Sequence, residues 1–596
     1  MRPLFFILLT LACPSHAAIQ RPNILWITSE DNGHYVRCFG DPMARTPNLD
    51  WLARGSTRFT HCFSNAAVCA PARQTLISGM YATSIGGQHM RSNATFPAGV
   101  HYFPKYLRAA GYYTSNNSKT DYNGGPADRE GAMKAAWDES GRKAHWRNRP
   151  KGKPFFSVFN IGSSHESNLF ASKWKKRELK TDPAKVHLPA YLPDLPETRR
   201  DLARYYDCIE TMDESVGKIL RELGDDGLAE DTIVFYFGDH GGSLPRGKSF
   251  TYDSGTRVPL IVHIPEKWES LRATEPGGET DRLASFVDFA PTVLSLVNIA
   301  APDYMQGQSF LGKSSEAREF VHTFRGRRGE RYDIVRGVRS KDFLYLRNYT
   351  PHLPVMQYND YSSGIPSYGA WRNAIKAGNG TPDQAQWFVP KAREELYDTR
   401  NDPDNVHNLM ADPKYAKILA RHRVENKRHM ASIRDSAFFP EGMSGRDYAK
   451  YQDEKTYPLG RLQSLANATK VSRFIEAMKD GDPKIRYWGV MGCIVHGQTT
   501  KELKRLLEDP EPLIRIQAAR AICGTKADPA SVAVLREQLQ AKDQILQLRA
   551  ALAVDECNLI RTDPSLAALL KNVRGQYGKR VATHILTKAK RAQSVD

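Results

Sequence analysis

Three segments of this chain are continuously apolar, and each ends in polar residues that can carry chemistry. They cover residues 23–28, 155–161 and 232–237 and are rich in β-branched and aromatic side chains. Such runs are typical of strands that are buried on both faces of a parallel sheet. Helical patterns lie between them, most clearly over residues 200–223, and strands that alternate with helices predict an α/β domain. Sites in such sheets lie beyond the carboxyl ends of the strands, which is where the polar residues fall here.

Acidic and imidazole side chains follow the ends of these segments. Glu30 and Asp31 come just after the first segment, and His165 follows the second. Asp239 and His240 close the third. Taken singly, such acids are more often solvated loop ends or helix caps. Together, at one edge of one sheet, three carboxylates and one imidazole are mostly hard oxygen donors, which suit Ca²⁺ or Mg²⁺ better than a soft-ligand metal. The sequence therefore predicts a metal site at this edge.

Cys69 begins a run that predicts a helix with its first residues near the cysteine. Pro71 suits the first helical position, where its missing N–H costs nothing. Arg73 lies four residues after Cys69 and would share its face of the helix. Free backbone N–H groups, the helix dipole and the guanidinium together predict an anion site around Cys69. The residues of this helix expected to face a core are Leu76, Ile77 and Met80.

The length of 596 residues exceeds that of one ordinary domain, so two or three domains are expected. We expect a catalytic α/β domain over residues 18–318, whose last helix starts near residues 288–294. Short strand-like pieces over residues 319–410 predict a smaller sheet, followed by a helical connection. This second unit spans residues 319–455, and the third, residues 456–596, is predicted to be all-helical.

The last unit contains three similar segments, in which an acidic residue precedes an apolar or Ala-rich helical stretch. They carry Arg486, Arg515 and Arg549, which are spaced by roughly 30 residues. The pattern resembles HEAT-type repeats, which stack helix pairs into a curved scaffold. An ordinary helical bundle explains it equally well.

Residues 1–17 have the pattern of a secretory signal, with Arg2, an apolar stretch over residues 4–11 and a small-x-small cleavage site at residues 15–17. We therefore expect an exported protein, periplasmic or secreted. A buried first strand or helix is the alternative interpretation. Cys13 lies in an imperfect lipoprotein box, which makes a lipid anchor a second, less favoured alternative. No later segment approaches about 20 uninterrupted apolar residues, so we expect no membrane span.

The formal charge of +18 and the pI near 9.4 predict attraction to polyanions. With an export signal, a sulfated polysaccharide is favoured over nucleic acid, and we expect no nucleic-acid partner; basicity that serves solubility alone remains an alternative. Eight cysteines spread over this length do not form a disulfide framework. Because no CxxC pair is present, a structural zinc site is not expected.

The run Cys69-Ala70-Pro71-Ala72-Arg73 resembles the Cys-x-Pro-x-Arg signature of the type I sulfatases, in which a maturation enzyme oxidises the cysteine to formylglycine (3-oxoalanine). Other blocks of that family match in their usual order. They are residues 21–27 with Glu30 and Asp31, residues 46–50, residues 238–241, residues 257–262, and residues 396–398 with 401–403. The resemblance covers residues 21–410, and leaves the C-terminal repeats outside.

The resemblance implies an alkaline-phosphatase-like α/β/α sandwich, one bound Ca²⁺, and hydrolysis of sulfate esters or sulfamates of a sulfated carbohydrate. The implied metal ligands are Glu30, Asp31, Asp239, His240 and the modified Cys69. Lys119 and Lys248 match the lysines that hold the sulfate, and His165 matches a histidine of the sulfate pocket, our candidate general acid for the leaving group. In this mechanism one hydroxyl of the hydrated aldehyde, acidified by the metal and Arg73, attacks sulfur, and the second later expels sulfate.

One position departs from the family pattern. The family has a histidine two residues after the first sulfate-holding lysine, and this chain has Asp121 there. The Asp121 carboxylate would repel sulfate unless it faces a cation. The sequence therefore does not establish that this position supplies the base for sulfate release. Three segments are most similar to the branch around N-sulfoglucosamine sulfohydrolase: residues 29–32, 119–123 and 164–167.

Two further residues, His89 and Arg91, are predicted to line the substrate pocket, with a plain surface loop as the alternative. Two other functions stay open. One is a phosphatase or phosphonate monoester hydrolase of the same superfamily, and the other is a non-catalytic protein that binds polyanions. The sugar, the position of the sulfate, exo or endo action, the ligand of the repeats and the oligomeric state are not determined by the sequence.

Overall fold

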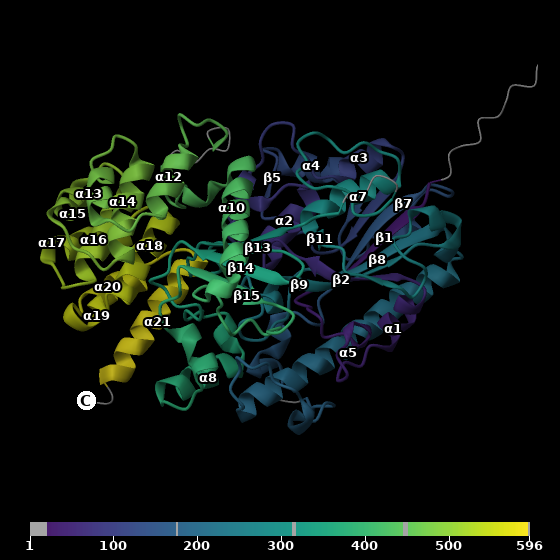
Figure 1. The fold of residues 1–596 in the computed structure, drawn as a ribbon, viewed down its shortest axis with the longest axis horizontal. Helices are drawn as coiled ribbons and strands as arrows, with labels where there is room; N and C mark the ends of the chain where they lie inside the picture. Colours follow the sequence, from purple (N-terminus) through teal and green to yellow (C-terminus); the bar gives the residue numbers. More distant parts are fainter. Residues whose placement is uncertain (1–20, 175–176, 313–316, 445–450, 594–596) are drawn as a thin grey trace, which may run out of the picture.

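The computed structural model describes residues 21–174, 177–312, 317–444 and 451–593. The predicted export signal and Cys13 lie outside these described residues. Figure 1 shows a layered α/β part and, beside it, a block of helices formed by the end of the chain. Among the described residues, none of the helices has the length and apolar character required to cross a membrane.

The central sheet of the large part has nine strands. Their order is β10-β2-β9-β8-β1-β7-β4-β6, and β11 also pairs with β2. All neighbours are parallel except β9, which runs antiparallel to β2 and β8. The strands are β1 (Asn23–Ser29), β2 (Thr57–Phe63), β4 (Tyr113–Asn117), β6 (Glu139–Ser140), β7 (Phe155–Ile161), β8 (Thr232–Gly238), β9 (Arg257–His263), β10 (Glu279–Thr280) and β11 (Ala284–Ser285). The predicted α/β class with a mainly parallel sheet is confirmed.

Helices cover both faces of this sheet, which explains why its strands are apolar throughout. Trp26 and its neighbours on one face pack with Leu76 and Phe289 from the helices above. Ile27, on the opposite face, packs with Leu202 and the other helices below. The first layer contains α2 (Cys69–Ser78), α3 (Pro104–Ala109), α4 (Arg129–Ala136) and α7 (Phe289–Leu296), and the second contains α1 (Pro47–Arg54) and the long α5 (Pro196–Asp225). The α/β/α sandwich is therefore present.

The register of the three central strands brings their carboxyl ends to one level. β1 lies between β7 and β8, and Ser29 is paired with Ile161 on one side and with Gly238 on the other. Two backbone hydrogen bonds continue this alignment past the strand ends: Glu30 N–H donates to the Ile161 carbonyl at 3.0 Å, and Asp239 N–H donates to the Ser29 carbonyl at 2.9 Å. The polar residues that follow the strands must therefore emerge side by side.

A second, smaller sheet is antiparallel throughout, in the order β12-β13-β14-β15. Its strands are β12 (Val321–Arg325), β13 (Val335–Arg339), β14 (Phe343–Asn348) and β15 (Glu394–Asp398), and α10 (Ala416–Ser432) packs along it. A bridge between Ala66 and Phe324 connects its first strand to the segment just before α2. β3 (Ala94–Thr95) and β5 (Gly124–Gly125) form a separate two-stranded parallel sheet. Shorter helices are α6 (Asp253–Thr256), α8 (Pro366–Lys376) and α9 (Pro382–Ala385).

The C-terminal part is helical among the described residues. Its helices are α12 (Leu459–Ala466), α13 (Val471–Ala477), α14 (Pro483–Val495), α15 (Lys501–Arg505), α16 (Pro512–Cys523), α17 (Pro529–Leu539), α18 (Gln544–Glu556), α19 (Leu559–Thr562), α20 (Leu566–Lys571) and α21 (Gln576–Gln593). The three similar segments each start a helix here, because Asp482, Glu511 and Asp543 accept backbone N–H groups of the first turns of α14, α16 and α18. The boundaries of the three units remain predictions, and so do the HEAT-type repeats of the C-terminal unit.

Candidate active site

Cys69 is the first residue of α2, and the whole helix is buried. The preceding residue, Val68, is extended, so the chain turns sharply into the helix at the cysteine. The sequence placed Pro71 at the first helical position, and this detail is wrong by two residues. Pro71 is tolerated at the third position because N–H groups of the first turn have no partner within the helix. Cys69 therefore lies at the positive end of the helix dipole, as expected.

Asp31, Cys69, Asp239 and His240 form one compact buried group, with one candidate ligand atom from each lying within 4.8 Å of the others. The thiol of Cys69 lies 3.3 Å from His240 Nε2 and 3.8 Å from Asp31 Oδ1. His240 Nε2 is 3.1 Å from the same Asp31 oxygen. Asp31 has a positive φ of 50°, which turns its N–H onto Asp239 Oδ1 at 2.9 Å. The carboxylates are thus held beside the cysteine.

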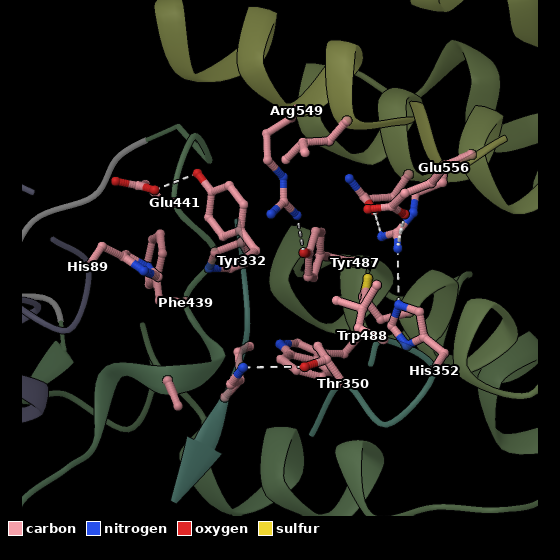
Figure 2. Close-up of a pocket in the computed structure, with 18 of the residues that line it drawn as sticks. His89, Tyr332, Thr350, His352, Phe439, Glu441, Tyr487, Trp488, Arg549 and Glu556 are labelled. Atoms are coloured by element: carbon pink, nitrogen blue, oxygen red, sulfur yellow. Dashed lines mark hydrogen bonds and ion pairs between the residues drawn. The ribbon is translucent and has the colours of Figure 1, made fainter. Parts of the chain in front are cut away.

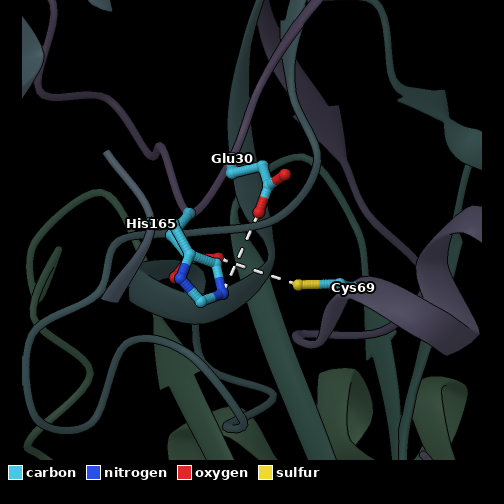
Figure 3. A group of neighbouring side chains, drawn as sticks. Glu30, Cys69 and His165 are labelled. Atoms are coloured by element: carbon cyan, nitrogen blue, oxygen red, sulfur yellow. Dashed lines mark hydrogen bonds and ion pairs between the residues drawn. The ribbon is translucent and has the colours of Figure 1, made fainter. Parts of the chain in front are cut away.

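A second group shares Asp31 and Cys69 and adds Glu30 and His165, again within 4.8 Å. Figure 3 shows Glu30, Cys69 and His165 pointing toward one another from three separate segments. His165 Nε2 lies 3.9 Å from Glu30 Oε2, while its Nδ1 interacts with the Ser167 hydroxyl at 2.9 Å. His165 therefore presents its Nε2 to the interior of the site, next to the sulfur.

Three cationic side chains surround these acids. Lys248 Nζ lies 2.9 and 2.8 Å from the two oxygens of Asp31 and 3.4 Å from His165 Nε2. Lys119 Nζ lies 2.7 Å from Glu30 Oε2. Arg73, in the first turns of α2, donates to Asp239 Oδ2 at 3.1 Å. The sequence-predicted residues Glu30, Asp31, Cys69, Arg73, Lys119, His165, Asp239, His240 and Lys248 are thus brought together at the edge of the sheet.

These close charges shift the pKa values of the site strongly. Burial alone would raise the pKa of Cys69, but the Lys119 and Lys248 ammonium groups lower it to about 6. Burial would also raise the pKa of Asp239, which His240 and Arg73 hold at about 2. Burial lowers the pKa of His240, yet Asp239 and Cys69 raise it well above the ordinary histidine value. The site therefore holds Asp31 and Asp239 ionised at neutral pH.

The donor set of the two groups suits a hard divalent cation. Asp31 and Asp239 offer ionised carboxylate oxygens, and Glu30 and His240 stand beside them. Ca²⁺ takes such oxygen ligands in flexible geometry, so the residues fit it. The buried cluster can hold a metal ion directly beside the sulfur of Cys69.

Four residues of the site escaped the sequence reasoning. Glu166 lies between Lys248 (2.9 Å) and the buried Arg328, to which it makes two short hydrogen bonds of 2.7 and 2.8 Å. Ser243 donates to Asp31 Oδ2 at 3.1 Å, and Asn160 accepts from Arg73 at 2.6 Å. Glu166, Asn160 and Ser243 each stand within a few positions of a predicted residue, which was an available signal. Arg328 comes from the loop between β12 and β13 and carries no such signal.

The two predicted substrate residues lie in different surroundings. His89 lines a cavity of about 50 Å³ between the α/β part and the C-terminal helices, together with Tyr332, Glu441 and Arg549 (Figure 2). Its Nδ1 accepts the Arg327 N–H at 3.0 Å. The cavity lies in a different place from the candidate site. His89 remains only a prediction as a substrate residue.

Arg91 is half-exposed and pairs with Asp121, at 3.5 Å between Nε and Oδ1. Asp121 does face a cation, the condition under which the sequence analysis allowed an anion near the sulfate. Its neighbour two residues earlier, Lys119, belongs to the group around Cys69. Arg91 therefore stands near the candidate site, one ion pair removed from it.

Comparison with known proteins gives consistent matches. A family model described as Sulfatase matches residues 22–299. An ulvan-active sulfatase of Formosa agariphila is 38% identical, over 71% of this chain and 77% of that protein. The human N-sulphoglucosamine sulphohydrolase is 26% identical, over 67% of this chain and 87% of its own. The solved phosphonate monoester hydrolase of Silicibacter pomeroyi shares the fold, with a TM-score of 0.52 at 17% identity over 71% of this chain and 97% of its own.

Proposed function

This chain belongs to the sulfatase family, and we propose that it hydrolyses sulfate esters or sulfamates of a sulfated carbohydrate with a formylglycine formed from Cys69 and a bound Ca²⁺. The observation that carries the proposal is the placement of Cys69 at the start of α2. There its Sγ lies 3.3 Å from His240, and four cationic or imidazole side chains stand around the same acids. Family membership also speaks against a purely non-catalytic polyanion-binding protein.

The residues available to Ca²⁺ are Glu30, Asp31, Asp239 and His240, together with the modified Cys69. Bound there, the ion would supply positive charge next to the nucleophile and the sulfate oxygens. The formylglycine would supply, as its hydrate, a nucleophilic hydroxyl and a second hydroxyl for release of sulfate.

The side chains of the chain itself then have distinct tasks. Arg73, Lys119 and Lys248 surround position 69 with fixed positive charge, where the negative charge of a sulfate in transfer has to be stabilised. Their mutual ion pairs with Asp239, Glu30 and Asp31 hold them in place before substrate arrives.

His165 is placed to donate a proton to the leaving oxygen or nitrogen from its Nε2. Before Cys69 is oxidised, burial and Lys248 lower its pKa, but Asp31 and Cys69 raise it overall above the ordinary histidine value; the effect of Asp31 does not depend on the cysteine. A raised pKa keeps a fraction of the imidazole protonated near neutral pH, as a general acid requires. The Ser167 contact of Nδ1 fixes the ring so that Nε2 faces the site.

An ulvan-active sulfatase and an N-sulphoglucosamine sulphohydrolase among the relatives support a sulfated glycan as the substrate class. We propose a sulfated polysaccharide, or an oligosaccharide derived from it, for this chain. We also propose export by the N-terminal signal and oxidation of Cys69 by a maturation enzyme. The division into units at residues 18–318, 319–455 and 456–596 belongs to the same proposal.

Mass spectrometry of the peptide that spans Cys69, taken from the native host, tests the nucleophile. We expect an aldehyde at position 69, and an intact thiol throughout would contradict the mechanism. Parallel assays of sulfate and phosphonate or phosphate ester turnover test the reaction class. We expect a higher kcat/KM for sulfate esters than for phosphorus esters. The opposite result would show that the enzyme is a phosphatase or phosphonate monoester hydrolase.

A further inference from the structure

The last helix of the chain returns to the neighbourhood of the candidate active site. In Figure 1, α21 runs from the C-terminus at the lower left toward the centre of the molecule, so that its first turns face the α/β part. The Tyr577 ring lies 4.8 Å from the guanidinium of Arg327, and the Arg580 guanidinium lies 5.3 Å from the Tyr361 ring. The first two turns of α21 thus touch loops of the second sheet.

A chain of direct contacts leads from the sulfate-holding lysine to α21. Lys248 pairs with Glu166, and Glu166 makes its two hydrogen bonds to Arg328. The Arg328 guanidinium lies 6.0 Å from the centre of the Tyr361 ring, whose opposite partner is Arg580. The charges of the site also act on Tyr361. Burial and Glu166 raise its pKa, and Lys248 lowers it. Only a few contacts therefore separate Arg580 from Lys248.

A second route reaches the same helix from the other lysine. Asp121 lies two positions after Lys119 and pairs with Arg91. Burial lowers the pKa of Arg91, but Asp121 and Tyr577 raise it overall. Arg580 and Tyr577, at which the two routes end, lie within one turn of α21.

Arg580 has hydrogen-bonding capacity to spare. Its guanidinium lies 3.9 Å from Glu330 and 3.8 Å from Asp360, distances too long for hydrogen bonds. Among the described residues its N–H groups make no hydrogen bond, and its side chain is 18% exposed. Arg91 is 51% exposed. A guanidinium presents several donors in a planar fork, which suits sulfate and carboxylate groups.

We propose that Arg580, together with Arg91, binds a second anionic group of the sugar chain, a sulfate or a carboxylate, next to the sugar that carries the scissile sulfate. The C-terminal helical part is then a component of the substrate site and selects chains over isolated sulfate esters. The Arg580 guanidinium lies 5.3 Å from the centre of the Tyr361 ring and 5.7 Å from that of the Tyr577 ring, which hold it in place. This inference rests on the proposed function, because it assigns the substrate of the same site.

The test separates chain binding from the chemical step. Affinity for ulvan and for heparin is measured by calorimetry on the full-length protein in a Cys69→Ala background, which prevents turnover. Arg580→Ala should weaken the better-bound glycan by about tenfold or more, the size expected for a hydrogen bond to a charged group. Arg580→Lys keeps the charge near Glu330 and Asp360 and should give a smaller loss. Lys590→Ala removes the same charge from the same helix three turns away and should change the affinity less than twofold.

Turnover of 4-nitrocatechol sulfate by the variants with Cys69 intact completes the test. The ratio of kcat/KM for the glycan to kcat/KM for 4-nitrocatechol sulfate should fall in Arg580→Ala, and it should stay within twofold of the wild type in Lys590→Ala. Unchanged glycan affinity in Arg580→Ala, no binding of either glycan, or an equal loss with Lys590→Ala would overturn the inference. Absence of 4-nitrocatechol sulfate turnover by the matured wild type would instead count against the proposed function, and the calorimetric result would stand apart from it.

Discussion

The Lys248 ammonium lies between both carboxylate oxygens of Asp31, at 2.9 and 2.8 Å, and both side chains are buried. Burial lowers the pKa of Lys248, but Asp31 and Cys69 raise it well above the ordinary lysine value. The pair is therefore charged, and it fixes an acid that we propose as a metal ligand next to a lysine that we propose for the sulfate. Binding and stability are coupled at this pair.

Lys248→Met should destabilise the protein as well as inactivate it. The substitution leaves Asp31 and Glu166 without one buried cation, and breaking a buried pair in this way costs about 3–5 kcal/mol. Denaturant unfolding would measure the loss. Lys218→Met removes a lysine that is 75% exposed and should change the free energy of unfolding by less than about 1 kcal/mol. Equal effects of the two substitutions would contradict a role for the buried pair.

Cys69→Ala should abolish sulfate release, with a loss of at least about a thousandfold in kcat, because no other side chain supplies the nucleophile. Thermal unfolding should confirm that the variant is folded. Cys38→Ala, which alters a partly buried cysteine outside the group, should retain full activity. Turnover that survives in Cys69→Ala would refute the mechanism.

Removal of Ca²⁺ with a chelator should abolish activity and lower the Tm, since the acids that hold the ion then repel one another. Added Ca²⁺ should restore both, and the Tm should rise with its concentration as for any ligand of the native state. Asp239→Asn should weaken the dependence of the Tm on Ca²⁺. A Tm that changes neither with the chelator nor with added Ca²⁺ would show that the cluster does not bind the ion.

Stability should fall in acid partly through Glu166. Burial raises the pKa of Glu166, but Arg328 and Lys248 hold it at about 2, below the ordinary 4.5. A carboxyl with a depressed pKa stabilises the fold fully above the unfolded value, and this contribution is lost as the pH falls from 4.5 toward 2. Glu166→Gln should therefore be less stable than the wild type at pH 7, with a difference of a few kcal/mol that shrinks toward pH 2. A difference that stays constant with pH, or one matched by the exposed Glu275→Gln, would contradict this reading.

Lys119→Met should lower kcat/KM for sulfate esters by about a hundredfold, the usual effect of losing one charged donor to the transition state. Glu30, its partner at 2.7 Å, would then lack its cation, so Ca²⁺ affinity should be measured alongside. Lys119→Arg should recover part of the rate because it keeps the charge. Full activity in Lys119→Met would remove this residue from the site.

The sequence predicted the α/β architecture and the group around Cys69 because both depend on local patterns. A continuously apolar strand such as β1 indicates burial on both faces of the sheet. The residues just beyond neighbouring strands lie close together because these strands end at the same edge. The confirmed fold and the clustering of Asp31, Cys69 and Asp239 follow from this rule.

Contacts between distant segments could not be predicted in the same way. Arg328 reaches Glu166 from a loop 162 positions later in the chain, and Arg580 reaches Tyr361 from the last helix. His89 and Arg91 are close in sequence, yet Arg91 pairs with Asp121 whereas His89 Nδ1 accepts the Arg327 N–H, and the role of both in substrate binding stays a prediction. Side-chain pairing across long loops depends on packing that no short motif records.

The three strands that carry the candidate site, β1, β7 and β8, are each seven residues long and end level with one another. Deleting one residue from any of them would withdraw its terminal side chains by about 3.3 Å, more than a metal–oxygen bond can stretch. Loop insertions elsewhere leave that alignment untouched. Engineers who wish to retarget this enzyme should therefore keep the length of these three strands and the loops that carry Lys119, Lys248 and Arg328, and vary the rest of the rim.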